Sequence, residues 1–153
     1  QFKGIKRRLE TVGVEGGVTV LDDFAHHPTA VHETLLALRT GYPARRIWAV
    51  FEPRSASSCR RIFQHDFARA FGAADEVVVA AVFRSTLPEA ERLSAEELVA
   101  ELREAGQRAR YIADVDEIVS TIVRERRDGD VVVLMSNGGF GGIHRTLLQA
   151  LSA

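Results

Sequence analysis

The stretch Val131-Val132-Val133-Leu134-Met135 decides the fold, because it is apolar at every position. A second run, from Glu76 to Val82, is nearly all Val and Ala. A strand with one face in water alternates apolar and polar residues, whereas a strand covered on both faces is apolar throughout. We therefore expect both runs to be inner strands of a mostly parallel sheet with helices on its two faces.

Segments with helical periodicity separate these strands from their neighbours. Apolar spacing predicts helices over about 29–39 and 59–71, with a short apolar strand at 47–51 between them. Two later helices have clear starts, the first at Ser94 and the second at Asp114. In each, a Glu follows three residues later, which is the capping-box pattern. Strands joined through helices of this length form right-handed parallel crossovers.

The sequence near the N-terminus predicts that the first two strands are joined by a short turn and not by a helix. Two β-prone runs, 6–14 and 18–21, flank a short loop containing Gly16 and Gly17, as in a β-hairpin. No linker or repeat divides the chain, and 153 residues suit one domain. The predicted fold is a three-layer α/β domain, residues 1–153, with a mostly parallel sheet of about six strands and an N-terminal β-hairpin.

Composition excludes several classes of protein. Lys and Arg total 20 against 21 Asp and Glu, a formal net charge of −1, which argues against a nucleic-acid partner. Cys59 is the single cysteine, so no disulfide framework exists and a reducing cytoplasm is expected. The longest apolar stretch, 77–83, is far shorter than the ~18 residues of a membrane span. The N-terminus has no apolar signal-like segment. Because the chain opens at Gln1 and not at Met, we expect it to be a piece of a longer protein or a protein with a processed start.

Polar residues follow several predicted strands at the point where each strand ends. In an open parallel sheet, ligands bind beyond the carboxyl ends of the strands. The opposite edge is expected to carry helix stops, such as Gly41, Gly72 and Gly106. The candidate site therefore lies at the carboxyl edge, whose segments are 22–28, 52–55, 83–86 and 136–142.

Segment 22–28, Asp-Asp-Phe-Ala-His-His-Pro, is the richest in chemistry. Its carboxylates and imidazoles are able to coordinate a divalent cation, orient ribose hydroxyls or exchange protons. In an arbitrary protein the more frequent alternative is an Asp that caps the next helix, beside surface histidines. Zinc is disfavoured, because no further His or Cys follows at ligand spacing, and no metal ligand is assigned.

Two other groups of residues leave alternatives open. Loop 136–142, Ser-Asn-Gly-Gly-Phe-Gly-Gly, could bring backbone N–H groups to an anion or form a tight turn. It matches neither the P-loop nor the dinucleotide fingerprint, and the chain has no P-loop elsewhere. Arg54, Arg60 and Arg61 stand at the start of a predicted helix, where cations are unfavourable. They could capture a carboxylate or phosphate, or form a solvated charged face.

Four blocks in order resemble the C-terminal domain of the Mur ligase family: 4–9, 22–29, 51–55 and 135–144. The resemblance spans essentially the whole chain. It implies a Rossmann-like domain that is the third domain of a longer ligase. The first two domains, outside this sequence, would bind the UDP-sugar and carry the P-loop with its magnesium site.

The resemblance implies an ATP-dependent amide ligation in which ATP and Mg²⁺ are bound mainly by the central domain. Blocks 51–55 and 135–144 resemble the branch that joins UDP-N-acetylmuramate to the tripeptide L-Ala-γ-D-Glu-meso-diaminopimelate in peptidoglycan recycling. Block 22–29 resembles the branch that adds L-alanine, which is the alternative. No catalytic residue is implied within this domain, and the 153-residue chain alone is expected to be inactive.

Roles for individual residues also follow from the resemblance. Arg8 and Asp23 are implied to bind ATP, at its phosphates and near its ribose, and Asp23 is expected to act there without a large role in stability. Which of the three arginines 54, 60 and 61 meets the substrate carboxylates stays open. The implied substrate-binding residues are Phe24, His26, His27, Arg54, Ser136 and Asn137.

Two readings outside this family remain as rivals. One is a metal-dependent phosphoesterase that uses Asp22, Asp23, His26 and His27. It would need further Asp or His ligands at other strand ends, and the ends after Val50 and Met135 supply none. The other is a non-catalytic nucleotide-binding module. Both rivals predict that the isolated chain binds its ligand, whereas a Mur C-terminal domain should bind ATP weakly by itself.

Overall fold

The structure is a computed structural model that describes residues 9–54, 60–82 and 87–153. Arg8 and Cys59, which the sequence analysis singled out, and segment 83–86 lie outside the described residues.

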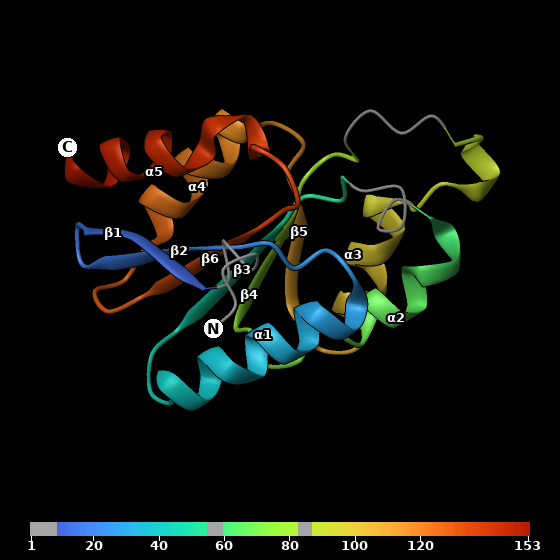
Figure 1. Ribbon diagram of the computed structural model, residues 1–153, viewed down its shortest axis with the longest axis horizontal. Coiled ribbons are helices and arrows are strands. Elements are labelled where there is room, and N and C mark those ends of the chain that lie inside the picture. Colours follow the sequence, from blue (N-terminus) through green and yellow to red (C-terminus); the bar gives the residue numbers. More distant parts are fainter. Residues whose placement is uncertain (1–8, 55–59, 83–86) are drawn as a thin grey trace, which may run out of the picture.

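A single six-stranded sheet forms the middle of the molecule (Figure 1). The first two strands form an antiparallel hairpin, and every other neighbouring pair is parallel. The predicted mostly parallel α/β sheet with an N-terminal hairpin is confirmed. In spatial order the strands are β1 (Glu10–Glu15), β2 (Val18–Asp23), β6 (Val131–Met135), β3 (Ile47–Phe51), β4 (Glu76–Val79) and β5 (Arg108–Tyr111).

Strand β6 lies inside the sheet, between β2 and β3. Val131 pairs in register with Thr19 on one side and with Ile47 on the other. All five β6 residues are fully buried, as an apolar strand covered on both faces must be. The chain reaches this position last, after β5, so the final crossover passes back over two strands.

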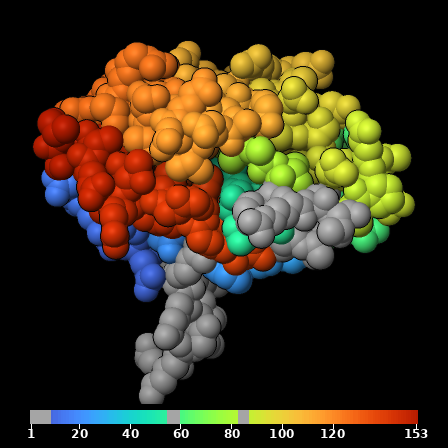
Figure 2. All heavy atoms as spheres, turned by 90° about the horizontal axis from the view of Figure 1, so that it is seen from above, coloured from blue at the N-terminus to red at the C-terminus, as the bar shows by residue number. Residues whose placement is uncertain are grey.

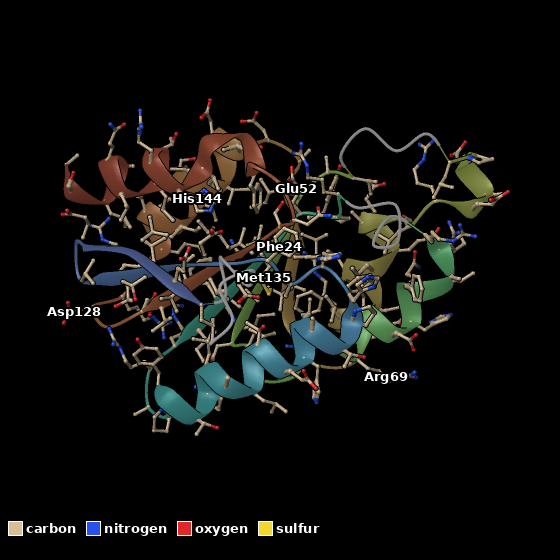
Figure 3. The ribbon with its side chains drawn as sticks, in the orientation of Figure 1. Phe24, Glu52, Arg69, Asp128, Met135 and His144 are labelled. Atoms are coloured by element: carbon tan, nitrogen blue, oxygen red, sulfur yellow. The ribbon has the colours of Figure 1, made fainter. Side chains whose placement is uncertain are left out.

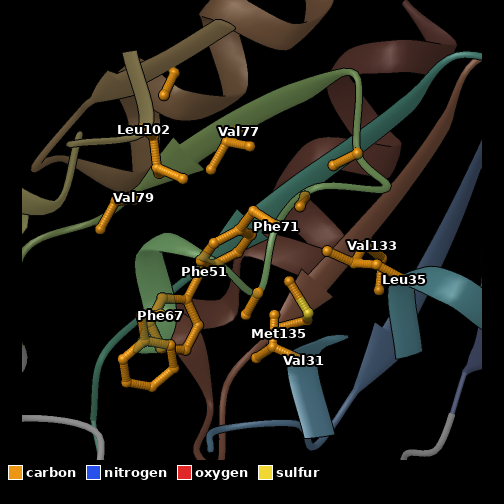
Figure 4. Packing of buried hydrophobic residues seen from close by; sticks show 14 of the residues in the cluster. Val31, Leu35, Phe51, Phe67, Phe71, Val77, Val79, Leu102, Val133 and Met135 are labelled. Atoms are coloured by element: carbon orange, nitrogen blue, oxygen red, sulfur yellow. The ribbon is translucent and has the colours of Figure 1, made fainter. Parts of the chain in front are cut away.

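Helices cover both faces of the sheet and make the three predicted layers. Helices α1 (Pro28–Gly41), α2 (Gln64–Ala68) and α3 (Ala95–Glu104) cover one face. Helices α4 (Val115–Glu125) and α5 (Ile143–Ser152) pack side by side on the other (Figure 2). Each face has its own apolar cluster, and Figure 4 shows Phe51, Phe67 and Met135 in the cluster beneath α1 and α2.

The helix predicted over 59–71 is shorter than expected. Its described part begins with a 3₁₀ turn at Arg61–Phe63, and α2 then ends at Ala68. The N–H of Ala70 donates to the Phe67 carbonyl, three residues back, so the chain tightens into turns instead of continuing the α-helix. Ala70 and Phe71 stay buried within those turns, which explains why their apolar spacing resembled a longer helix.

Both predicted N-caps are present, but only the N-cap half of each capping box is formed. The Ser94 hydroxyl accepts a hydrogen bond from Glu97 N–H (3.1 Å), and Asp114 caps α4 in the same way through Glu117 N–H (3.1 Å). The Glu97 carboxylate does not return to Ser94. The Ser94 N–H donates instead to Gln64 Oε1 at 2.9 Å. A tertiary partner from α2 has replaced the local one.

None of the helices in the described part of the chain combines the length and the hydropathy that a membrane crossing requires.

Candidate functional site

The described candidate residues gather at the carboxyl ends of β2, β6 and β3. The chain leaves β2 and β3 toward α1 and α2 on one face, whereas it leaves β6 toward α5 on the other. Such a divergence opens a crevice beyond the strand ends, where ligands of open α/β sheets bind. Figure 3 shows Phe24, Glu52 and Met135 close to this point.

Asp23, the last residue of β2, is 2% exposed. Its carboxylate accepts hydrogen bonds from the N–H groups of Leu9 (2.8 Å) and Ala25 (2.9 Å) and from the Thr34 hydroxyl (3.1 Å). Leu9 itself has a positive φ of 51°, which is uncommon for a residue with a side chain. The Asp23 carboxylate clamps the chain before β1 to the start of α1, which argues against the expectation that Asp23 has little part in stability.

The Asp22 side chain lies on the face of the sheet opposite to that of Asp23. Its Oδ1 lies 2.8 Å from His144 Nε2, in the first turn of α5. Adjacent residues of a strand point to opposite faces, so Asp22 and Asp23 do not converge on one ion. Within the described ranges, no group of three or more His, Cys, Asp or Glu is arranged to hold a metal. The structure therefore gives the phosphoesterase reading no support.

Four aromatic rings form a row from the end of β2 toward α2. Phe24 is 41% exposed and meets His26 edge-on, with centroids 5.1 Å apart. The row continues through His27 (4.6 Å) to Phe63 (6.3 Å). The Nδ1–H of His26 donates to the Phe24 carbonyl at 2.9 Å, which fixes the orientation of its ring. His27 also lines a hollow of about 610 Å³ between α1 and α2, so these rings form a surface at the carboxyl edge.

Ser136 and Asn137 follow β6 directly, and they differ in their partners. Ser136 is 1% exposed; its hydroxyl donates to Glu52 Oε1 (2.7 Å) and accepts from Gly138 N–H (3.0 Å). A hydroxyl has a single hydrogen to donate, so Ser136 holds the loop. The Oδ1 of Asn137 is buried and meets no donor among the described residues. Such an acceptor is costly to leave unpaired, so Asn137 stays a candidate for a hydrogen bond that the described residues do not supply.

The structure separates the arginines that the sequence left equivalent. Arg61 donates to Glu97 at 2.8 Å, and this hydrogen bond raises the pKa of the Arg61 guanidinium. Arg60 is exposed and forms an isolated bridge with Arg92. Arg54 instead crosses to the loop after β6, with Nη1 3.8 Å from Glu52 Oε1. Of the three, Arg54 is the one beside the candidate residues.

Two residues that organise this edge, Glu52 and Thr34, were not predicted from the sequence. Glu52 was noted only as part of a strand-end segment, yet it is 6% exposed and joins Ser136 to Arg54. It also lines a hollow of about 450 Å³ beyond β3, β4 and β5. A buried Glu directly after an apolar strand could have signalled this role. Thr34 lies in mid-helix and gave no signal.

The described residues do not offer ATP a prepared site. The Asp23 carboxylate is buried and already accepts from Leu9, Ala25 and Thr34, so this arrangement does not present it to a ribose hydroxyl. Arg8 lies outside the described residues. Both ATP assignments therefore remain predictions about the longer protein.

Comparison with known proteins decides the family. Residues 7–138 match the family described as Mur ligase, glutamate ligase domain. The chain belongs to the Mur ligase family. That match confirms the resemblance seen in the four sequence blocks.

Individual Mur ligases extend the comparison. The chain is 45% identical, over 99% of its length, to the UDP-N-acetylmuramate–L-alanyl-γ-D-glutamyl-meso-2,6-diaminoheptandioate ligase of Escherichia coli. It is 35% identical, over 97% of its length, to the UDP-N-acetylmuramate–L-alanine ligase of Lachnoclostridium phytofermentans. The crystal structure of a murein peptide ligase from Psychrobacter arcticus superposes with a TM-score of 0.81 at 35% identity, covering 96% of this chain and 30% of that one. The chain spans about a third of the length of the curated relatives, 31% in both cases.

Proposed function

We propose that this chain is the C-terminal domain of an ATP-dependent ligase that joins UDP-N-acetylmuramate to L-Ala-γ-D-Glu-meso-diaminopimelate. The 45% identity to the Escherichia coli ligase of that specificity, along essentially the whole chain, carries the proposal. The similarity to the L-alanine-adding relative is lower, at 35%. The domains that bind the UDP-sugar and the bulk of ATP and Mg²⁺ belong to the rest of the longer protein.

The reaction divides its tasks between those domains and this one. ATP, when bound, supplies the phosphoryl group that turns the muramate carboxylate into an acyl phosphate. The peptide amine then attacks the carbonyl carbon, phosphate leaves, and the amine loses a proton as the amide forms. In this chain, Arg54 binds a carboxylate of the peptide, and Asn137 Oδ1 accepts a hydrogen bond from a peptide N–H. The ring row from Phe24 to Phe63 borders the peptide's path.

The test uses the full-length protein with UDP-N-acetylmuramate, ATP and either the tripeptide or free L-alanine. We expect kcat/KM to be higher for the tripeptide. A preference for L-alanine would assign the protein to the alanine-adding branch instead. An inactive full-length protein with both amines would overturn the ligase proposal.

Arg54→Ala tests the carboxylate contact within that assay. Loss of a charge-assisted hydrogen bond costs about 1.5–3 kcal/mol, which lowers kcat/KM for the tripeptide about 10- to 150-fold and leaves the KM for ATP unchanged. Arg124→Ala is the control, because Arg124 is exposed on α4 and reaches Glu125 only at 3.7 Å. Equal effects of the two substitutions would contradict the role of Arg54.

A further inference from the structure

The loop after β6 and the segment after β3 are joined by one carboxylate. Glu52 Oε1 accepts the Ser136 hydroxyl at 2.7 Å and lies 3.8 Å from Arg54 Nη1. The Glu52 backbone N–H also donates to the Met135 carbonyl at 3.0 Å. Glu52 is therefore tied to β6 by both its backbone and its side chain, and Arg54 is the cation beside it.

Gly138 makes room for the Arg54 side chain. A Cβ added at Gly138 would fall on Cδ, Nε and Cζ of Arg54, so the arginine lies directly against the glycine. Gly138 does not have a positive φ, so backbone conformation does not require glycine here. The neighbouring Gly139 also has a negative φ, −81°, and a Cβ there would meet nothing within 4 Å. A side chain at position 138 would therefore collide with Arg54, whereas a side chain at position 139 would not.

We propose that Glu52 and Gly138 are positioning residues that hold the Arg54 guanidinium across the loop, ready for the peptide carboxylate. The inference rests on the proposed function and deepens it. A free arginine side chain samples many rotamers, and ordering such a side chain on binding costs affinity, up to about tenfold. Packing on Gly138 and pairing with Glu52 restrict those rotamers before the peptide arrives. Glu52 and Gly138 thereby favour amine substrates that carry a carboxylate within reach of Arg54.

Gly138→Ala in the full-length enzyme is the central test, with Gly139→Ala as the matched control. The new methyl group displaces a flexible side chain and not backbone, so folding is retained. We expect Gly138→Ala to raise the KM for the tripeptide about five- to tenfold, without changing the KM for ATP. Gly139→Ala should keep the wild-type KM. Equal KM values for the two variants would overturn the proposal.

A double substitution identifies Arg54 as the residue through which Gly138 acts. In an Arg54→Ala background, Gly138→Ala should have no further effect on KM, because the displaced side chain is gone. A full effect in that background would mean that Gly138 serves the loop itself and not Arg54. Glu52→Gln keeps the shape and the acceptor for Ser136 but removes the charge. It should also raise the tripeptide KM while the thermal midpoint stays near wild type.

An NMR measurement on the 153-residue chain separates this inference from the ligase proposal. The Arg54 Nε–H resonance should be protected from solvent exchange in the wild type and in Gly139→Ala. It should exchange faster in Gly138→Ala and Glu52→Gln. Unchanged exchange in both variants would refute the positioning role whatever the activity of the longer protein. A wild-type enzyme without ligase activity, combined with the expected exchange pattern, would refute the ligase proposal but not the positioning of Arg54 by Glu52 and Gly138.

Discussion

The two edges of the sheet both bury carboxylates, but they pair them differently. At the amino edge, Asp130 accepts from Arg46 (2.7 Å) and from Trp48 Nε1 (2.9 Å), and Glu76 pairs with Arg108 (2.6 Å). At the carboxyl edge, Asp23 accepts only from backbone N–H groups and a hydroxyl among its described partners. The amino edge is a neutralised network that holds elements together. The carboxyl edge uses its carboxylates to shape loops, and this is the edge where we propose that the peptide binds.

The largest expected effect lies at the amino edge. Asp130 is 1% exposed, and Asp130→Ala would leave the half-buried Arg46 without its main partner. Removing one member of a buried ion pair costs about 3–5 kcal/mol. We expect urea unfolding of the 153-residue chain to show a loss of that size. A loss below about 1 kcal/mol would mean that the edge is not held by charge pairing.

Low pH should reduce the stability that the amino edge contributes. Burial raises the pKa of Asp130, but hydrogen bonds from Arg46, the Arg127 N–H and Trp48 outweigh it and hold the pKa below its usual range. A lowered folded-state pKa gives stability that is complete above the ordinary value, about 3.9, and is lost as the pH falls through the folded-state value. The stability difference between wild type and Asp130→Asn should therefore shrink below about pH 4. A constant difference down to about pH 2 would contradict the lowered pKa.

Asp23→Ala should lower the free energy of unfolding less than Asp130→Ala does. It tests whether the carboxyl edge contributes to stability. The substitution leaves the N–H groups of Leu9 and Ala25 without an acceptor, and each unsatisfied buried group costs about 1–3 kcal/mol. Because the Leu9 contact is only partly buried, we expect a total near 2 kcal/mol. Asp23→Asn, which keeps an acceptor oxygen, is the control and should lose less. Equal losses of stability in Asp23→Ala and Asp23→Asn would show that the negative charge of Asp23 stabilises the fold and that its hydrogen bonds do not.

The fold was largely predictable, because its signal is local and repeated. Five apolar residues at 131–135 require cover on both faces, and β6 lies inside the sheet with helices on both sides. The end of α2 was not predictable. Buried Phe71 continues the apolar spacing, and spacing does not distinguish a helix from a series of tight turns.

The candidate site was predictable in place but not in detail. The order of strands and loops brought Asp23, Arg54 and Ser136 to one edge, as the parallel sheet requires. Their partners are distant in sequence: Ser136 bonds to Glu52, 84 residues away. The amino edge was missed for the same reason. Its glycines were visible as helix stops, whereas the pairing of Arg46 with Asp130 spans 84 residues.

The smallest expected effect belongs to Arg61→Ala, and it separates Arg61 from Arg54. Arg61 and Glu97 are 41% and 58% exposed and pair at 2.8 Å. Exposed ion pairs contribute little to stability because solvent screens them and both side chains lose rotamer freedom. We expect the thermal midpoint of the chain and the tripeptide KM of the full-length enzyme to stay near wild type, with changes in KM below about twofold. Glu97→Gln is the matched control, since it removes the same pair from the other side. The contrary result is that Arg61→Ala raises the tripeptide KM as much as Arg54→Ala does, while Glu97→Gln leaves it unchanged. Arg61 would then leave Glu97 to bind the substrate, and the conclusion that Arg54 alone of the two meets the peptide would be wrong.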